Sequence, residues 1–387
     1  MDIKKTDSEF IAATYKKFDV VLVRGEGSLL YDENGSEYID LTSGIAVNTF
    51  GICDEVWKKA VTDQLNLLAH TSNLYYTEPA AKLAELLCAK SGMKKVFFSN
   101  SGAEANECAI KAARKYSSDK YGADTSRKKI ITLKESFHGR TIATLSATGQ
   151  EVFHKDFGPF VDGFEYAEPD TEEIINLMSD PDCCAVMLEL IQGEGGIRAL
   201  DAEYVSRVVQ KAEENDILVI IDEVQSGNGR TGYYFSYQMY GIEPDIVTTA
   251  KGLGGGLPIG AALFAEKTKD VLGAGSHGST FGGNLVCAAG ALSIAERIDE
   301  KLLEEVRRKS EYLFSELQSC SGVKSVSGAG FMIGVQTVKE ASAAVSELIE
   351  KGVLVLTAKD KIRLLPALNI PDELLRKAAG IIKEVLS

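Results

Sequence analysis

The stretch that decides the fold runs from Ile217 to Gly256 and reads ILVIIDEVQSGNGRTGYYFSYQMYGIEPDIVTTAKGLGGG. It holds two short apolar runs, at 217–221 and 245–250, which predict buried strands of a sheet. The first run is followed by Asp222 and the second by Lys251. Charged residues directly after such strands lie at the edge where open α/β sheets bind ligands. The pattern therefore predicts an acid and an amine side by side in a crevice.

Two interpretations of this pair stay open. A salt bridge at a strand end is a common structural feature. The residues after Lys251, however, include four glycines that leave the space around its amine free of side chains: Gly252, Gly254, Gly255 and Gly256. A lysine that bonds covalently to an aldehyde cofactor needs this room. An aspartate such as Asp222 keeps a pyridine nitrogen protonated, so that the ring attracts electrons, and the second interpretation is therefore pyridoxal phosphate chemistry.

Length and composition narrow the class of protein. A chain of 387 residues is expected to form one large and one smaller domain. The formal charge of −14 argues against nucleic acid as a partner, and no long apolar run predicts a membrane span. The start MDIKKTDSEF is too polar for a secretory signal peptide. The seven cysteines form no CxxC pair and fit reduced thiols in a cytoplasmic protein, and the four histidines lack metal-ligand spacing, so we expect no metal.

The segment Lys95–Asn106 is a candidate phosphate cradle. Its first four residues predict a strand, a small polar turn follows, and an alanine-rich helix begins there. This order presents unpaired backbone N–H groups and the positive end of a helix to an anion. We expect Ser101, Gly102 and Ala103 at the helix start. The alternative is a capping box of Ser101 and Glu104, and both interpretations can hold at once.

Three further stretches carry candidate ligand-binding side chains. The residues FHGR at 137–140 follow a predicted strand, where an aromatic ring can stack on a cofactor and an arginine can bind a carboxylate or form an ion pair at the rim. The glycine- and hydroxyl-rich loop 274–284 offers Ser279 and Thr280 as phosphate ligands, in one arrangement from a partner subunit. Arg363 lies in an apolar run, which is unfavourable unless an anion pairs with it.

The remaining pattern predicts an α/β fold whose mostly parallel sheet has helices on both faces. Residues 260–265 are expected to form an antiparallel edge of that sheet. From Gly322 onward short strands alternate with helices, which predicts a smaller α+β domain that packs with the N-terminal ribbon. We expect an N-terminal segment of the small domain at 1–50, the large α/β domain at 51–300 and the C-terminal small domain at 301–387.

Six motifs occur in order: SGAEAN at 101–106, FHGRT at 137–141, QGEGG at 192–196, IDEVQ at 221–225, AKG at 250–252 and HGSTFGGN at 277–284. Together they resemble the class III ω-aminotransferases, which have the pyridoxal phosphate fold type I. The resemblance covers nearly the whole chain, from about Thr14 to the C-terminal helix. The chain departs from the family pattern at Gly51–Glu55, Leu190 and Leu285, none of which carries the expected chemistry.

The resemblance implies a homodimer that binds pyridoxal 5'-phosphate near the subunit interface. Lys251 would hold the cofactor and move a proton, and Asp222 would pair with the ring nitrogen. The other cofactor contacts that it implies are Ser101, Gly102, Ala103, Phe137, His138, Val224, Gln225 and, reaching in from the partner subunit, Thr280. For the substrate, the resemblance implies that Arg140 binds a carboxylate and that Arg363 binds the α-carboxylate of glutamate or 2-oxoglutarate. Glu189 would pair with Arg363 when a donor presents its distal amine. Ser279 and Tyr15 would lie near the bound substrate.

The N-terminal stretch, residues 14–48, resembles in particular the family members that act on N-acetylornithine. This implies transfer of the terminal amino group of N-acetylornithine to 2-oxoglutarate, in arginine biosynthesis. Ornithine, succinylornithine, succinyl-diaminopimelate and γ-aminobutyrate stay open as donors. An intramolecular aminomutase, which needs no 2-oxoglutarate, is a further enzyme class. A cofactor-binding regulator is disfavoured because it would normally add a basic DNA-binding module.

Overall fold

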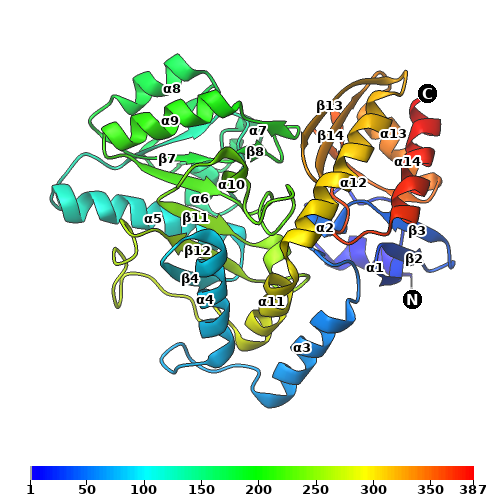
Figure 1. Ribbon diagram of the computed structural model, residues 1–387, viewed down its shortest axis with the longest axis horizontal. Helices are drawn as coiled ribbons and strands as arrows, with labels where there is room; N and C mark the ends of the chain where they lie inside the picture. Colours follow the sequence, from blue (N-terminus) through cyan, green and yellow to red (C-terminus); the bar gives the residue numbers. More distant parts are fainter. Residues whose placement is uncertain (1) are drawn as a thin grey trace.

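The computed structural model describes residues 2–387, and its centre is a seven-stranded sheet with the strand order β4-β12-β11-β10-β7-β5-β6 (Figure 1). The strands are β4 (Lys95–Ser99), β5 (Lys129–Leu133), β6 (Phe164–Ala167), β7 (Cys183–Leu188), β10 (Leu218–Asp222), β11 (Ile246–Thr249) and β12 (Gly260–Phe264). The five strands from β11 to β6 are parallel. The structure therefore confirms the predicted mostly parallel sheet.

The antiparallel strand β12 lies inside this sheet, and the prediction that it forms an edge is wrong. It pairs antiparallel with β11 on one side and with β4 on the other. All five of its residues are buried. A strand of small apolar residues with no charged side chain is poorly suited to an exposed edge, where unpaired N–H and C=O groups invite aggregation. Strand β4, from a distant part of the chain, closes that side.

Helices cover both faces of the sheet. Successive residues of a strand point to opposite faces, so Leu218 and Ile220 pack on one side and Val219 and Ile221 on the other. The first face is covered by α5 (Gly102–Tyr121) and α6 (Ile142–Ala147). The second face is covered by α4 (Glu78–Ser91), α8 (Thr171–Met178), α9 (Ala202–Glu214) and α11 (Leu285–Arg297).

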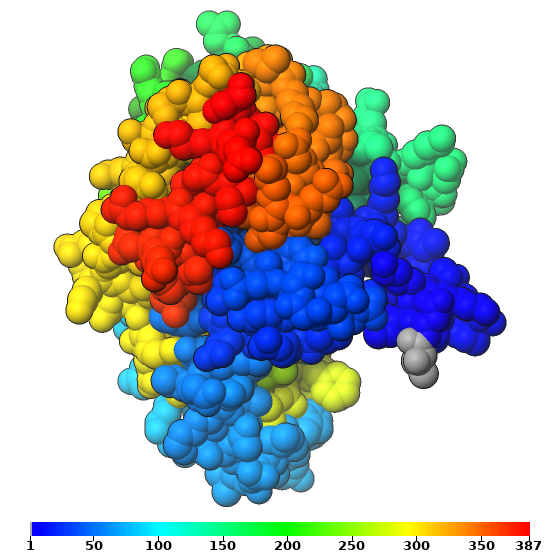
Figure 2. Space-filling model, turned by 90° about the vertical axis from the view of Figure 1, so that its right-hand side faces the viewer, coloured from blue at the N-terminus to red at the C-terminus, as the bar shows by residue number. Residues whose placement is uncertain are grey.

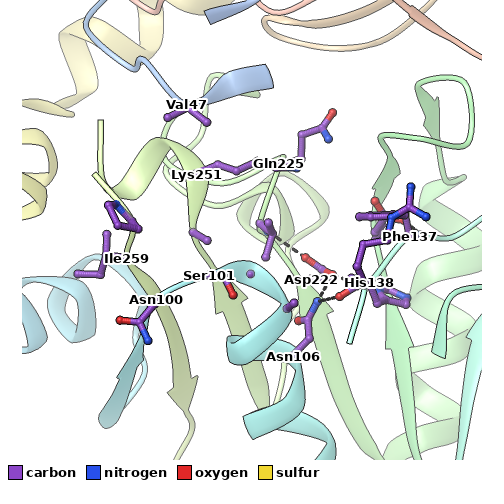
Figure 3. Close-up of a pocket in the computed structure, with 18 of the residues that line it drawn as sticks. Val47, Asn100, Ser101, Asn106, Phe137, His138, Asp222, Gln225, Lys251 and Ile259 are labelled. Carbon is purple, nitrogen blue, oxygen red and sulfur yellow. Dashed lines mark hydrogen bonds and ion pairs between the residues drawn. The ribbon is translucent and has the colours of Figure 1, made fainter. Parts of the chain in front are cut away.

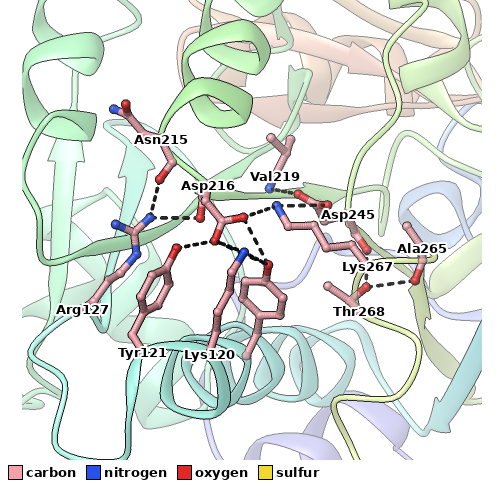
Figure 4. Close-up of polar contacts among 11 residues, drawn as sticks. Lys120, Tyr121, Arg127, Asn215, Asp216, Val219, Asp245, Ala265, Lys267 and Thr268 are labelled. Carbon is pink, nitrogen blue, oxygen red and sulfur yellow. Dashed lines mark hydrogen bonds and ion pairs between the residues drawn. The ribbon is translucent and has the colours of Figure 1, made fainter.

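The long helix α5 is anchored at the end far from the ligand-binding edge (Figure 4). Lys120 and Tyr121, in its last turn, donate to the carboxylate of Asp216, which precedes β10. Arg127 donates to the backbone carbonyls of Asn215 and Asp216 at 2.6 and 2.9 Å. Burial raises the pKa of Asp216, but these donors and Lys267 outweigh it and hold the pKa well below its ordinary value. The direction of α5 relative to β10 is thereby set.

The N- and C-terminal segments build a second unit. Its sheets are β13-β14-β17-β16 and β1-β2-β3-β15. The elements are β1 (Leu22–Glu26), β2 (Leu29–Asp32), β3 (Glu37–Asp40), α12 (Glu300–Gln318), β13 (Val323–Ala329), β14 (Met332–Thr337), α13 (Ala341–Glu350), β15 (Val353–Leu354), β16 (Leu356–Ala358), β17 (Lys361–Leu364) and α14 (Asp372–Leu386). Ile39 and Leu41 share one hydrophobic core with Val353 and Leu375. Figure 2 shows the same packing, because N-terminal residues (blue) lie against C-terminal residues (orange and red).

The predicted domain boundaries, at residues 50 and 300, stay a prediction.

Shorter elements complete the chain. They are α1 (Ile3–Phe10), α2 (Ser43–Ala46), α3 (Glu55–Leu67), α7 (Glu151–His154), β8 (Ile191–Gln192), β9 (Arg198–Ala199), α10 (Ser236–Tyr240) and the 3-10 turn η1 (Lys251–Leu253). Helix α1 has no buried residue. Within residues 2–387 no helix combines the length and the apolar character that a membrane crossing requires.

Candidate active site

A pocket of about 620 Å³ opens at the carboxyl ends of β10 and β11 (Figure 3). Asp222 is in register with Thr248 on the neighbouring parallel strand, and Lys251 follows where β11 ends. The volume lies within the usual range for sites that bind small molecules. The lining includes twelve of the residues predicted from sequence: Tyr15, Ser101, Gly102, Ala103, Phe137, His138, Arg140, Glu189, Asp222, Val224, Gln225 and Lys251.

Three predicted residues lie outside this lining. Ser279 accepts a hydrogen bond of 3.0 Å from Asn100, which does line the pocket. Thr280 is exposed in a neighbouring cavity of about 700 Å³. Arg363 lies behind Gln225 and donates to its side-chain oxygen over 3.4 Å. The fold of one chain thus brings most of the predicted set together, but not the hydroxyl-rich loop.

Lys251 is the first residue of η1 and has a φ of 45°, a backbone conformation that is strained for any side chain other than glycine. Burial of its amine lowers the pKa, while the carboxylates of Glu194 and Asp222 act in the opposite direction. The net shift is downward. A larger fraction of Lys251 is therefore neutral at physiological pH than for an exposed lysine, and the neutral amine is the nucleophilic form.

The carboxylate of Asp222 is held by groups from three parts of the chain (Figure 3). Asn106 of α5 donates from Nδ2 over 2.8 Å, and Nδ1 of His138 lies 2.8 Å from the same carboxylate oxygen. The backbone N–H of Val224 donates to the other oxygen over 3.0 Å. Asp222 is only 4% exposed. These contacts satisfy both oxygens of a buried carboxylate and hold it in one orientation.

The start of α5 lies where the sequence places the candidate anion cradle, at Ser101, Gly102 and Ala103. The first four N–H groups of a helix have no acceptor within it. Ser101 satisfies one of them, since its hydroxyl accepts from Glu104 N at 3.2 Å, and its carbonyl accepts the first bond within the helix, from Ala105 N at 3.0 Å. The N–H groups of Gly102 and Ala103 remain for an anion in the pocket. The predicted capping box is incomplete, because the Glu104 carboxylate binds the N–H of the preceding residue 100.

The pocket wall between β5 and α6 carries an aromatic ring and a free cation. The backbone N–H of Phe137 donates to Glu189 over 2.8 Å, which fixes the start of this wall. The guanidinium carbon of Arg140 lies 4.0 Å from the ring centre of Phe153 and 5.3 Å from that of Phe137. Among residues 2–387 the structure records no ion pair for Arg140. The alternative interpretation, an ion pair of Arg140 at the rim of the sheet, is therefore not found among these residues. The charge of Arg140 is available to a carboxylate.

The acid that pairs with Arg363 in the structure is Glu194, whereas the family resemblance implies Glu189 as its partner when a donor presents its distal amine. Arg363 is 4% exposed in β17, and its Nη1 forms an ion pair with Glu194. Burial raises the pKa of Glu194, but Arg363 outweighs burial, so that the pKa lies below its ordinary value. The carboxylate of Glu189 is already engaged by the N–H groups of Phe137 and Gly193, at 2.8 and 3.2 Å.

Glu194 is thus a candidate site residue that sequence reasoning missed. It lies in the QGEGG loop, and the signal that points to it is the glycine before it. A Cβ atom at Gly193 would come within 2.6 Å of Oε1 of Gln225. The glycine therefore lets this loop pass close to the side chain that also contacts Arg363. An acid between glycines, directly after a buried strand, is the pattern of a residue that reaches into a crevice.

The described residues 2–387 contain no group of three or more histidine, cysteine, aspartate or glutamate side chains placed to hold a metal ion. The polar groups of the pocket instead suit an organic anion with an aromatic ring. The N–H groups of Gly102 and Ala103 face one side, and Nε2 of His138 is buried without a partner among the described residues. A Cβ at Gly102 would meet Val224 at 2.6 Å, so the close approach of the helix start to Val224 requires this glycine.

Residues 10–386 match the model of the aminotransferase class-III family. The acetylornithine aminotransferase of Haemophilus ducreyi is 52% identical over 388 residues, which cover 100% of this chain and 98% of that protein. An ornithine aminotransferase structure from Toxoplasma gondii, with partial occupancy of pyridoxal phosphate, has a TM-score of 0.94 at 29% identity and covers 99% of this chain and 93% of that one. The N-acetylornithine aminotransferase structure from Stenotrophomonas maltophilia has a TM-score of 0.85 at 33% identity, over 98% and 97%.

This chain belongs to the class-III aminotransferase family. It is an aminotransferase, and its cofactor is pyridoxal phosphate. The pocket fits that cofactor, because it combines a helix start for a phosphate, a charged carboxylate for a ring nitrogen and a lysine amine of lowered pKa. The family predicted from the six sequence motifs is confirmed.

Proposed function

We propose that this enzyme transfers the terminal (δ) amino group of N-acetylornithine to 2-oxoglutarate and forms N-acetylglutamate 5-semialdehyde and glutamate, a step of arginine biosynthesis. The full-length relative from Haemophilus ducreyi is named for acetylornithine and supports this donor. The structural observation that carries the proposal is the ion pair between the buried Arg363 and the partly buried Glu194, beside Gln225.

The two half-reactions place opposite demands on this ion pair. N-acetylornithine must offer its terminal amine, with its α-carboxylate far from the cofactor, so no carboxylate arrives at Arg363. Glu194 then neutralises the buried guanidinium, which would otherwise be an unpaired charge. Glutamate must offer its α-amine and presents two carboxylates. One of them displaces Glu194 from Arg363, and the other binds Arg140 on the opposite wall.

The cofactor is held by residues from four elements in this proposal. The N–H groups of Gly102 and Ala103 would bind its phosphate, and Asp222 would accept a hydrogen bond from its protonated ring nitrogen. Val224 and Phe137 lie against the two faces of the ring, Gln225 contacts the ring hydroxyl, and His138 supports Asp222. These assignments are supported by the shared lining of one pocket.

The chemistry that the cofactor supplies when bound is an aldehyde that takes up the amino group and a ring that withdraws electrons from the substrate carbon. The chain supplies binding and proton transfer. Lys251 would hold the cofactor through Nζ, and its amine would carry the proton that leaves the amine-bearing carbon of the donor. Asp222 keeps the ring nitrogen protonated throughout, and Arg140 orients the substrate.

We also propose a cytoplasmic homodimer in which Thr280 reaches the cofactor phosphate of the partner subunit. Thr280 is exposed and lies outside the pocket of its own chain. Its cavity is shared with Leu74, which is 90% exposed, and Tyr75 and Tyr76 beside it are exposed as well. An apolar surface of this kind supports a subunit contact. In the same proposal the small domain comprises 1–50 and 301–387.

A half-reaction experiment tests the donor. The purified holoenzyme is mixed with N-acetylornithine, ornithine, γ-aminobutyrate or succinyl-diaminopimelate in turn, without an acceptor, and loss of the visible cofactor absorbance is followed. N-acetylornithine is expected to react fastest, and Lys251→Ala to show no conversion with any donor. A faster reaction with another donor would overturn the assignment of N-acetylornithine while leaving the family unchanged.

Ornithine is the second candidate donor, because the Toxoplasma gondii ornithine aminotransferase superimposes with a TM-score of 0.94 against 0.85 for the N-acetylornithine enzyme of Stenotrophomonas maltophilia. The sequence identity instead favours the N-acetylornithine enzyme, at 33% against 29% for the ornithine enzyme. Ornithine carries a free α-ammonium group where N-acetylornithine has a neutral amide. The same half-reaction experiment separates the two.

A further inference from the structure

A chain of buried hydrogen bonds leads away from Asp222 to a residue outside the pocket. Oγ1 of Thr248 donates to Oδ1 of Asn106 over 2.6 Å, and Nδ2 of Asn106 donates to Oδ2 of Asp222 over 2.8 Å. The three residues are 0%, 1% and 4% exposed. They come from β11, α5 and β10, so the contact is a product of the tertiary fold. No step proposed above uses Asn106 or Thr248.

The strand register explains why these side chains meet. Asp222 and Thr248 are direct partners in the parallel pair β10–β11, and partners in register point to the same face of a sheet. That face is the one which α5 covers, because Ile220 and Ile246 pack there against α5 residues such as Ala109. Asn106 lies one turn into α5 and bridges the two strands.

The neighbours of Asn106 allow only one orientation of its amide. Nδ2 lies 2.7 Å from the backbone oxygen of His138 and 2.8 Å from the Asp222 carboxylate. Both are acceptors only, so the NH₂ group must face them. The amide oxygen then faces Thr248, whose hydroxyl must donate. Because Thr248 donates to the amide oxygen of Asn106, it stabilises the orientation in which the NH₂ group faces His138 and Asp222.

The lone pairs of Asp222 show what this arrangement achieves. A carboxylate oxygen accepts about two hydrogen bonds. Oδ2 receives two, from Asn106 and from Nδ1 of His138. Oδ1 receives one from the protein, from Val224 N, and keeps one acceptor position. The donors on Oδ2 stabilise the charged form and leave Oδ1 as the oxygen with capacity for a further proton donor.

We propose that Asn106 and Thr248 are positioning residues that hold Asp222 charged, with Oδ1 free to accept a hydrogen bond from the protonated ring nitrogen of the cofactor. The inference rests on the proposed role of Asp222. Without Asn106 the charged carboxylate loses one of its three protein donors. The proton between the ring nitrogen and Asp222 then shifts toward the carboxylate, and the electron demand of the ring falls.

The test uses holoenzyme reconstituted with pyridoxal phosphate that carries ¹⁵N in its ring, because the ¹⁵N chemical shift reports the protonation of that nitrogen directly. The variants are Asn106→Leu, which removes the donor, and Thr248→Val, which keeps the shape but removes the hydroxyl. Both are expected to move the ¹⁵N signal toward that of Asp222→Ala and to raise the cofactor dissociation constant about tenfold. Thr248→Ser, which restores a hydroxyl, is expected to return both quantities to wild-type values.

The chain offers a matched control in Thr249→Val. Thr249 is also fully buried and accepts a hydrogen bond of 2.9 Å from a buried asparagine, Asn228, but it points to the other face of the sheet. Its loss should lower the unfolding temperature about as much as Thr248→Val and leave the ¹⁵N signal in place. An equal shift of the signal in Thr249→Val would overturn the inference, because the effect would then be general loosening.

Two further outcomes separate this inference from the proposal beneath it. If Asp222→Ala changes the ring signal while Asn106→Leu and Thr248→Val leave it unchanged, the positioning role is wrong and the role of Asp222 stands. If Asp222→Ala itself leaves the signal unchanged, both are wrong. Should Asn106→Leu fold poorly, Thr248→Val and Thr248→Ser still decide the question.

Discussion

At the residue scale, the carboxylates of Glu189 and Glu194, on either side of the short strand β8, have pKa values shifted in opposite directions. Burial raises the pKa of Glu189 to about 7, with the charge of Asp222 acting in the same direction and His138 against it. Glu194 is partly buried, and the guanidinium of Arg363 holds its pKa below the ordinary value even though burial acts in the opposite direction. The difference comes from the partners. Glu189 has backbone N–H groups, whereas Glu194 has a full positive charge.

The first prediction concerns Glu194→Gln, which keeps the size of the side chain and removes its charge. We expect the ratio of kcat/KM for N-acetylornithine to kcat/KM for glutamate to fall about tenfold, because Arg363 then keeps an unpaired charge that favours substrates with a second carboxylate. Steady-state kinetics with both donors measure the ratio. Glu189→Gln is the matched control and should change kcat/KM for both donors by the same factor. If Glu189→Gln alone changes the ratio, Glu189 and not Glu194 is the acid that pairs with Arg363 during the reaction.

The second prediction concerns the pH dependence of stability. The folded pKa of Glu189, about 7, lies above its ordinary value of 4.5. The folded state therefore binds this proton more tightly, so the contribution of Glu189 to stability is fully present below pH 4.5 and is lost as pH rises through 7. Glutamine does not titrate. The advantage of wild type over Glu189→Gln should decline across this window by at most about 3 kcal/mol.

Urea unfolding of the holoenzyme at a series of pH values measures this difference. Glutamine also turns a donor toward one backbone N–H group of Phe137 or Gly193, which lowers stability at every pH. The informative quantity is therefore the slope of the difference with pH and not its absolute size. A difference that stays constant from about pH 5 to pH 8 would show that Glu189 does not titrate there.

Helix α5 is the element that joins the phosphate cradle to the rest of the sheet. Its first turn offers N–H groups to the pocket, its second turn carries Asn106, and its last turn is tied to Asp216. One helix thus sets the distance between the anion site and the Asp222 carboxylate. The third prediction follows from the space at the start of this helix.

A Cβ atom at Gly102 would come within 2.6 Å of Val224 Cγ1 and 2.8 Å of Cγ2. Gly102→Ala should therefore push Val224 or the helix start aside and raise the cofactor dissociation constant about tenfold, since overpacking of this kind costs about 1–3 kcal/mol. Fluorescence titration of the apoenzyme with pyridoxal phosphate measures the constant. Wild-type affinity in this variant would show that the cradle tolerates the displacement.

Gly380→Ala is the control at the element scale. Gly380 lies inside α14, and a Cβ there would meet nothing within 4 Å. Alanine forms helices better than glycine, so this variant should gain about 0.5–1 kcal/mol in stability and bind the cofactor as wild type does. The two glycine variants together separate a helix-propensity effect from a steric effect in the pocket.

At the scale of the whole molecule, the loop that carries Thr280 is separated from the pocket of its own chain. The fourth prediction is that each site combines Lys251 of one subunit with Thr280 of the other. Hybrid dimers of a Lys251→Ala chain and a Thr280→Ala chain then contain one intact site out of two. They should show about half the activity of wild type, more than either parent dimer.

Co-expression of the two chains with different affinity tags allows the hybrid to be purified and assayed. Activity equal to the mean of the two parent dimers would show that Thr280 acts within its own chain. A protein that stays monomeric at assay concentration, with wild-type activity, would contradict the dimer altogether. Both results would leave the assignments of Lys251 and Asp222 in place.

Much of this arrangement is local in origin and could be predicted from sequence. The apolar runs before Asp222 and Lys251 each bury a strand, so their charged ends had to appear at the same edge of a parallel sheet. The start of α5 follows from Ser101 and the small residues after it. Glycines mark the places where the backbone must pass close to other groups, as at Gly102.

The sequence by itself therefore determined the fold class, the lysine–aspartate pair, the position of the α5 helix start and the family, because each depends on residues that are neighbours along the chain or on short motifs. Only the tertiary structure decided that Glu194 pairs with Arg363, that β12 lies inside the sheet and that Asn106 connects Asp222 to Thr248. Each of these depends on segments far apart in sequence. Such contacts are selected by packing and by the need to satisfy buried polar groups, and no local pattern along the chain records which of several acids or strands will meet.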